Sequence, residues 1–221
     1  TAKAKIEARA KERFDGEQAD YEAKMAARAA KAAKGKKPGG KPPKPPESGP
    51  RADDQINLTD EASRIMKVAG GGFEQCYNAQ AVVDTESMLI LAAHVTQATN
   101  DKEQVKPMVE KVQTNPEGLN RPKTWLADTG YYSEKNVATC LAAGIEPLIA
   151  VKRDEHHPGW RERFTEPAPL AGEASPVDAM KHALKTKLGR AAYALRKQTV
   201  EPVFGIIKSV MGFRQFLLRG L

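Results

Sequence analysis

The sequence has few cysteines and no long apolar segment, and these shortages exclude several classes of protein. Its two cysteines, Cys76 and Cys140, stand far apart among 221 residues. This number and spacing exclude a cysteine-rich zinc site and a disulfide scaffold, and fit a reducing cytoplasm with both thiols buried. The longest strongly apolar run, from Met88 to Ala93, is far shorter than the ~20 residues of a membrane-spanning helix. We therefore expect a cytoplasmic protein with no membrane partner.

Acidic residues are outnumbered, since 35 Lys and Arg stand against 28 Asp and Glu and give a net charge of +7. Such a surplus suits a polyanionic partner such as nucleic acid, although many ordinary soluble proteins share it. The imbalance is concentrated between Lys24 and Lys44, where eight residues are basic and none is acidic.

Residues 1–54 form a separate part with no pattern typical of a folded core. Residues 2–34 are rich in Ala and charge and predict a helix, or two helices broken at Phe14-Asp15-Gly16. Residues 36–50 are dense in Pro and Gly and predict a mobile basic linker, with a DNA-contacting arm as the alternative. The chain starts with Thr and stops directly after an amphipathic stretch, so we expect a piece of a longer protein.

Residues 55–221 have the sequence pattern of an α/β domain, in which β-type runs alternate with helical periodicity. The expected strands are 77–84, 88–96, 124–127 and 146–152. One helix is expected over 101–113, and a second begins at the cap Ser133, ends at Gly144 and turns Val137, Cys140 and Leu141 inward. A last helical stretch is expected over 180–213, with a kink or restart at Pro202. The Pro-rich residues 153–180 predict an insertion loop. This order predicts a mixed sheet flanked by helices.

Asp128 is the first candidate for chemistry. It follows the short buried strand 124–127 and precedes Gly130 and a capped helix, which places its carboxylate at the carboxyl edge of a sheet, where open α/β sheets carry their sites. A simple turn Asp is the alternative interpretation.

The second candidate is a helical group of Tyr193, Arg196, Glu201 and Lys208. Glu201 and Lys208 lie two turns apart on nearly the same helical face. A carboxylate with flanking cations can hold a divalent metal and bind phosphates around it. A charged, solvent-exposed helix face is the alternative.

These two motifs together resemble the DDE transposases of bacterial insertion sequences. Tyr193-x2-Arg196-x4-Glu201-x6-Lys208 is similar to the signature around the last acidic residue of that family, and Ala127-Asp128-Thr129-Gly130-Tyr131 is similar to its second-Asp motif. The segments 72–80 and 95–101 also resemble its core hairpin. The usual signature has three residues between Arg and Glu, so either Arg196 or Lys197 takes the Arg position. The resemblance covers roughly residues 55–221.

The resemblance implies a ribonuclease-H-like fold and metal-dependent DNA cleavage and strand transfer at insertion-sequence ends. Asp128 and Glu201 would be the second and third catalytic carboxylates and would hold two Mg²⁺ (or Mn²⁺) ions. Tyr193, Arg196 and Lys208 would contact transposon-end DNA. The partners would be transposon-end and target DNA and a second copy in a synaptic homodimer, at the bacterial nucleoid.

The first Asp of the family's triad has no clear position here. It belongs on a first core strand ahead of the hairpin, and nothing before residue 77 has the pattern of a central strand. We expect this strand and its Asp upstream of Thr1, with residues 1–54 as an insertion. Asp84 at the hairpin turn and Asp60 near a helix start are weaker candidates, because Asp is common there for local reasons.

Three functions stay open at this point. The first is a transposase, of which this fragment alone would be inactive. The second is a truncated relic that binds DNA but cannot cut it, and the third is a ribonuclease-H-like nuclease without a role in transposition.

Overall fold

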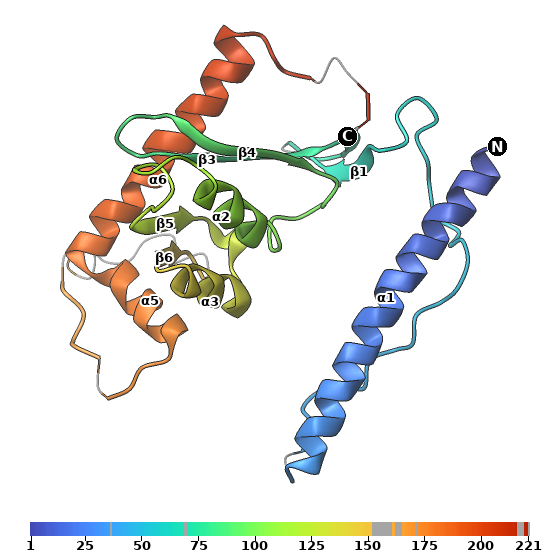
Figure 1. Ribbon diagram of the computed structural model, residues 1–221, viewed down its shortest axis with the longest axis horizontal. Coiled ribbons are helices and arrows are strands. Elements are labelled where there is room, and N and C mark those ends of the chain that lie inside the picture. The colour runs from blue at the N-terminus through green and yellow to red at the C-terminus, as the bar shows by residue number, and fades with distance from the viewer. Residues whose placement is uncertain are drawn as a thin grey trace. The chain divides into compact units, whose positions relative to one another are not determined.

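The computed structural model describes residues 1–35, 37–68, 70–151, 161, 165–170, 172–215 and 219–220. The chain divides into two compact units, residues 1–61 and residues 62–221 (Figure 1). Within the expected insertion loop 153–180, residues 153–160, 162–164 and 171 lie outside the described residues. The expected end of the loop at residue 180 is wrong, because a helix begins at Pro176. No helix within the described part is long and apolar enough to cross a membrane.

The first unit is built on one helix, α1 (Ala2–Ala33). The predicted break at Phe14-Asp15-Gly16 is wrong, because the helix runs through it without interruption. A single Gly costs only about 1 kcal/mol relative to Ala inside a helix. The many alanines and charged residues around Gly16 outweigh that cost, and the Thr1 side chain caps the first turn.

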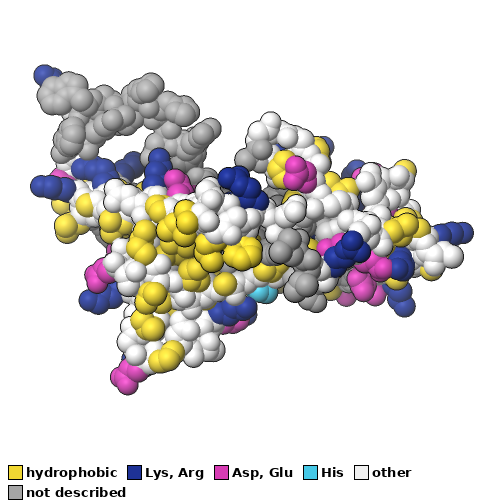
Figure 2. Space-filling model, turned by 90° about the horizontal axis from the view of Figure 1, so that it is seen from above, with side chains coloured by type: hydrophobic (Ala, Val, Ile, Leu, Met, Phe, Trp, Pro, Cys, Tyr) yellow, Lys and Arg dark blue, Asp and Glu magenta, His cyan; other side chains and the backbone are white. Residues whose placement is uncertain are grey.

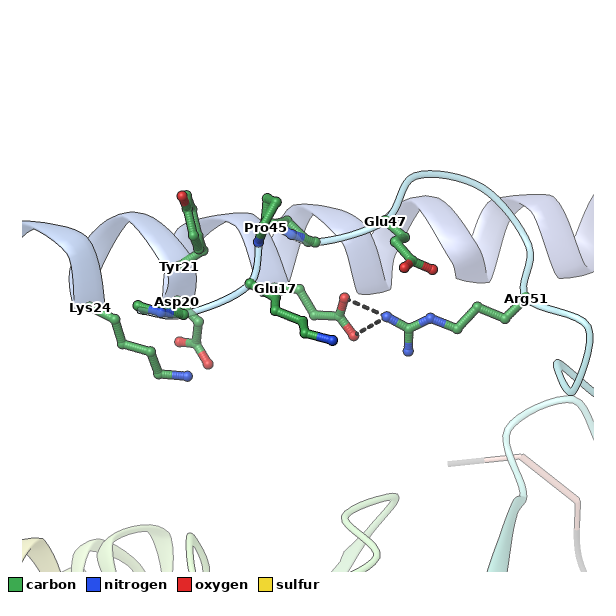
Figure 3. Close-up of a pocket in the computed structure, with 10 residues that line it drawn as sticks. Glu17, Asp20, Tyr21, Lys24, Pro45, Glu47 and Arg51 are labelled. Carbon is green, nitrogen blue, oxygen red and sulfur yellow. Dashed lines mark hydrogen bonds and ion pairs between the residues drawn. The ribbon is translucent and has the colours of Figure 1, made fainter. Parts of the chain in front are cut away.

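The segment after α1 has no helix or strand in its described residues 37–50, yet it is attached to α1 rather than free of it. Arg28 donates to the carbonyl oxygens of Gly39 and Gly40 at 2.8 and 3.2 Å. Arg51 pairs with Glu17 at 2.8 Å, and both residues line a pocket together with Tyr21 and the Pro-rich segment (Figure 3). The segment predicted to be a mobile basic linker therefore contacts helix α1 through these interactions.

The second unit begins with two antiparallel hairpins. The first pairs β1 (Arg64–Lys67) with β2 (Phe73–Cys76), and the second pairs β3 (Asn78–Val83) with β4 (Ile90–Thr96). The predicted strands 77–84 and 88–96 are thus confirmed.

Asp84 lies in the tight turn between β3 and β4. Its carboxylate accepts bonds from both the Ser87 hydroxyl, at 2.6 Å, and the Ser87 backbone N–H, at 2.7 Å. These hydrogen bonds lower the pKa of Asp84. The local turn therefore accounts for this residue without a catalytic role.

The core of the unit lies between two helices and two strand pairs. Helix α2 (Val105–Gln113) packs against β3, β4 and α3 (Glu134–Ala142), and α3 packs against β6 (Glu146–Ile149), which pairs in parallel with β5 (Thr124–Ala127). The side chains of Val105, Val112, Val137, Cys140 and Ile149 are almost fully buried there. Ser133 caps α3 and Gly144 has a φ of 73°, as predicted, whereas Leu141 is 45% exposed and was wrongly expected to face inward.

The C-terminal part has two helices in place of the single expected stretch 180–213. Helix α5 (Pro176–Lys185) meets α6 (Lys187–Gly205) at Thr186, and a π-helical turn, η2 (Ile206–Val210), follows. The corner is tight, since a Cβ on Gly189 would overlap the carbonyl oxygen of Ala183. Pro202 lies inside α6 and does not end it.

The architecture is mixed α/β, as predicted, but the strands of the described residues form three separate pairs rather than one sheet. The pairs are β1–β2, β3–β4 and β5–β6. Helix α6 packs against both β3 and β5 and so bridges the second and third pairs (Figure 1). Apolar side chains also gather on one face of this unit (Figure 2).

Candidate active site at the carboxyl end of strand β5

Asp128 stands directly after β5 and starts a single 3₁₀ turn, Thr129–Tyr131. The strand is fixed by the burial of Trp125 and Ala127, so the position of the following residue is set by the core. One carboxylate oxygen of Asp128 accepts the Gly130 N–H at 2.9 Å. The side chain is 50% exposed, which leaves the other oxygen accessible to a ligand.

Helix α6 brings Tyr193 and Arg196 to this strand end from 66 residues further along the chain. The Tyr193 hydroxyl donates to the carbonyl oxygen of Ala127 at 3.2 Å. A guanidinium nitrogen of Arg196 lies 3.8 Å from a carboxylate oxygen of Asp128, and its guanidinium carbon lies 5.6 Å from the Tyr193 ring centre. The two motifs that the sequence singled out therefore meet in space.

The Arg196 side chain is only 22% exposed, and its Nε is buried with no hydrogen-bond partner among the described residues. A buried donor without a partner is costly, and because this atom is buried it is not an exposed ligand position. Lys197, the alternative cation at the usual family spacing, is exposed. Arg196 is thus the cation that the fold places beside Asp128.

Glu201 and Lys208 are not in this group. Glu201 is exposed on α6, and its five-residue separation from Arg196 turns it about 140° around the helix from that side chain. Lys208 lies in η2 with its ammonium 5.6 Å from the Phe204 ring centre.

Asp101 is a neighbour of Asp128 that sequence reasoning missed. Its Oδ1 accepts the side-chain amides of Asn78 and Gln80 at 2.8 and 2.7 Å. A Cβ built on Gly130 would lie 3.1 Å from Asp128 Oδ1 and 3.4 Å from Asp101 Oδ2, so both carboxylates flank the same glycine. In the sequence Asp101 stands shortly before a helix, a common position for Asp, and no local signal links it to Asp128.

Tyr131, the last residue of the same 3₁₀ turn, is a partly buried neighbour of Asp128 and Asp101. Its hydroxyl donates to Oε1 of Gln80, and its carbonyl oxygen accepts the Asn136 amide at 2.6 Å. Burial raises the pKa of Tyr131, and the negative charges of Asp101 and Asp128 raise it further. Tyr131 is therefore a neutral hydrogen-bond donor at physiological pH.

The chemistry of the donors fits a hard divalent cation, because carboxylate oxygens are the ligands that Mg²⁺ and Mn²⁺ prefer. The number of donors is incomplete: no three His, Cys, Asp or Glu side chains come close enough to hold a metal ion within the described ranges. The expected pair of Asp128 and Glu201 does not yet make such a centre.

The comparisons with known proteins agree with these motifs. A family model described as "Transposase DDE domain" matches residues 40–221, which is most of the chain. The chain belongs to the transposase DDE domain family. The chain is also similar to the "Putative transposase for insertion sequence element IS402" of Burkholderia cepacia, with 38% identity over 74 residues, which are 31% of this chain and 35% of that relative. The match thus spans about a third of the relative's length. No solved structure matches this transposase DDE domain significantly.

Proposed function

We propose that the chain carries part of the active site of an insertion-sequence transposase, which cleaves transposon ends and transfers the strands to target DNA with divalent metal ions. The observation that supports this most is the meeting of Tyr193 and Arg196 with the strand end that bears Asp128. The two segments were singled out independently, and a charged solvent face would not turn Tyr193 and Arg196 inward.

In this proposal Asp128 and Glu201, which no described contact joins in this structure, would hold Mg²⁺ or Mn²⁺ together in the complete active site. When bound, two such ions activate the attacking oxygen and neutralise the charge that develops on the phosphate. Arg196 keeps the Asp128 carboxylate oriented until a ligand arrives, and its terminal guanidinium N–H groups then donate to a phosphate oxygen. Lys208 binds backbone phosphates, which supplies affinity rather than sequence recognition.

The proposed fold is a ribonuclease-H-like sheet completed by one more strand. The pairs β3–β4 and β5–β6 are separate among the described residues, yet α6 packs on both β3 and β5. A strand inserted between them would join the pairs into one mixed sheet. We propose that this strand lies outside residues 1–221 and carries the first carboxylate of the family's triad, which is consistent with the incomplete set of donors among the described residues.

The proposed partners are transposon-end DNA, target DNA and a second copy of the chain in a synaptic complex. The surplus of seven positive charges is consistent with a polyanionic partner. The proposed location is the bacterial nucleoid, where these substrates are found.

A DNA-binding relic without cleavage activity is the second candidate function. The lack of three close metal-binding side chains in the described part favours it. The relic and the enzyme differ in one observable, since only the enzyme forms new phosphodiester bonds.

The decisive experiment substitutes the two carboxylates in the full-length protein. We expect Asp128→Asn and Glu201→Gln each to reduce cleavage and strand transfer below about 1% of wild type while leaving the circular dichroism spectrum unchanged. Glu110→Gln is the matched control, since Glu110 is an exposed carboxylate on α2 that pairs only with Lys106 at 3.7 Å. Normal transposition by either active-site variant would refute the role of that residue.

A further inference from the structure

A polar network unconnected with the proposed DNA contacts ties β3 to the turn that carries Asp128. It starts at Asp101, which is half-buried and receives the side-chain amides of Asn78 and Gln80 on the same oxygen. Gln80 also donates to Oδ1 of Asn78 at 2.7 Å. Gln80 is only 6% exposed, so its amide has no access to bulk water as an alternative partner.

The Asp101 carboxylate fixes which way the Gln80 amide points. Both N–H groups of that amide face acceptors, Asp101 and Asn78, which leaves the amide oxygen directed at Tyr131. Tyr131 donates its hydroxyl to this oxygen across 51 residues of sequence. The carboxylate of Asp101 thus orients the Gln80 amide so that its oxygen binds a hydrogen-bond donor, here the Tyr131 hydroxyl.

The same turn is fixed at two further points. Asn136 donates from one amide nitrogen to the carbonyl oxygens of Tyr131 and Lys102, at 2.6 and 2.7 Å, and so joins the turn to the loop that carries Asp101. Gly130 fits between the Asp101 and Asp128 carboxylates, which would have to shift by a few tenths of an ångström to admit a Cβ. The turn that follows Asp128 cannot move without breaking one of these contacts.

We infer that Asp101 is a positioning residue, which acts through Gln80 and Tyr131 to hold the Asp128 carboxylate in the orientation that binds a divalent cation. This inference rests on the proposed role of Asp128. Asp101 is assigned no contact with the metal, because two amide donors occupy its Oδ1 and its Oδ2 faces Gly130.

The test compares Tyr131→Phe with Tyr132→Phe in the full-length protein. Each removes one hydroxyl oxygen, but Tyr132, also partly buried, has a hydroxyl that makes no hydrogen bond in the described part of the chain. Free Mn²⁺ is titrated by electron paramagnetic resonance without DNA, and cleavage is measured against Mg²⁺ concentration. We expect Tyr131→Phe to weaken Mn²⁺ binding about 10-fold or more, with saturating Mg²⁺ restoring most of the rate, as for other outer-shell partners of metal ligands. The Tyr132→Phe variant should match wild type.

A second pair of variants tests the link to Asp101. Asp101→Asn keeps an acceptor oxygen and Asp101→Ala removes it, so Mn²⁺ affinity should fall further in the Ala variant. The effects of Asp101→Ala and Tyr131→Phe should be less than additive, because both interrupt the same chain of bonds. Fully additive effects, or unchanged Mn²⁺ affinity with only a lower melting temperature, would overturn the inference. If Asp128→Asn is still active, the proposed function fails instead, and the two failures are thereby distinguished.

Discussion

The hydroxyl of Tyr193 donates a hydrogen bond to the carbonyl oxygen of Ala127, the residue immediately before Asp128. This bond attaches helix α6 to the end of β5 and sets where Arg196, one turn further along, can reach. The Tyr193 hydroxyl therefore binds the backbone of the site, and the Tyr193 ring makes a cation–π contact with the Arg196 guanidinium.

The first prediction concerns this hydroxyl. We expect Tyr193→Phe to lower the free energy of unfolding by about 1 kcal/mol, the usual net contribution of one hydrogen bond. The salt dependence of DNA binding should stay unchanged, because the phenol carries no charge. Urea unfolding and a salt titration of DNA affinity measure the two quantities. A lower DNA affinity at every salt concentration, with unaltered stability, would show that the hydroxyl contacts DNA.

Arg196 and Lys197 provide a matched pair for the cation at the site. Arg196→Ala should make the slope of log affinity against log salt less steep by about 1, as expected for one lost phosphate contact. Lys197→Ala should have a smaller effect, since Lys197 is exposed and makes no ion pair among the described residues, whereas Arg196 lies beside Asp128. Fluorescence anisotropy with transposon-end DNA at several salt concentrations measures both slopes. The reverse ranking would assign the signature cation to Lys197.

Gly189 and Gly205 test the corner between α5 and α6. Gly189→Ala places a methyl group against the Ala183 carbonyl and should destabilise the protein by about 1–3 kcal/mol, the usual cost of overpacking. Gly205→Ala, in the same helix with open space around it, should be neutral or stabilise by up to about 1 kcal/mol. Thermal unfolding followed by circular dichroism distinguishes them. Equal effects would show that the corner is not as tight as described.

The two cysteines should differ in reactivity. Burial raises the pKa of Cys140 to about 11, whereas Cys76 at the end of β2 is only partly buried. Since the thiolate is the reactive form, an alkylating reagent at pH 8 should modify Cys76 first and Cys140 only after unfolding. Mass spectrometry of the modified peptides over time gives the order. Early modification of Cys140 would contradict the packing of α3.

Tyr131 predicts a loss of stability at alkaline pH. Its pKa is raised in the folded state, so above pH ~10 the unfolded chain releases a proton that the folded chain retains. The contribution of Tyr131 is therefore complete below pH ~10 and decreases as the pH rises further. Tyr131→Phe should remove this part of the decrease in urea unfolding measured between pH 8 and 11. An identical decrease in the variant would place the titration elsewhere.

Several local elements of the second unit could be predicted from the sequence alone, whereas the hairpin β1–β2 and the division of the last helical stretch at Thr186 were not predicted. The β-rich runs on either side of Thr85-Glu86-Ser87 gave the hairpin β3–β4, and Ser133 with Gly144 gave the bounds of α3, because caps, turns and periodicity depend on neighbouring residues. The motifs at Asp128 and at Tyr193 and Arg196 were likewise recognisable as short patterns. Only the packing of α6 on β5 decided that they meet, and that Arg196 rather than Lys197 lies beside Asp128.

What the sequence alone determined is therefore local structure and the identity of the candidate residues. The tertiary structure decided the continuous helix α1 through Gly16, the exposed side of Leu141 and, above all, the place of Asp101 beside Asp128. Each of these depends on contacts between segments far apart in the chain or on a balance of small energies summed over many residues. Long-range contacts and summed small energies do not appear in the spacing of residues that are close in sequence. The hydrogen bonds among Asp101, Gln80 and Tyr131 could therefore be identified only in the folded structure.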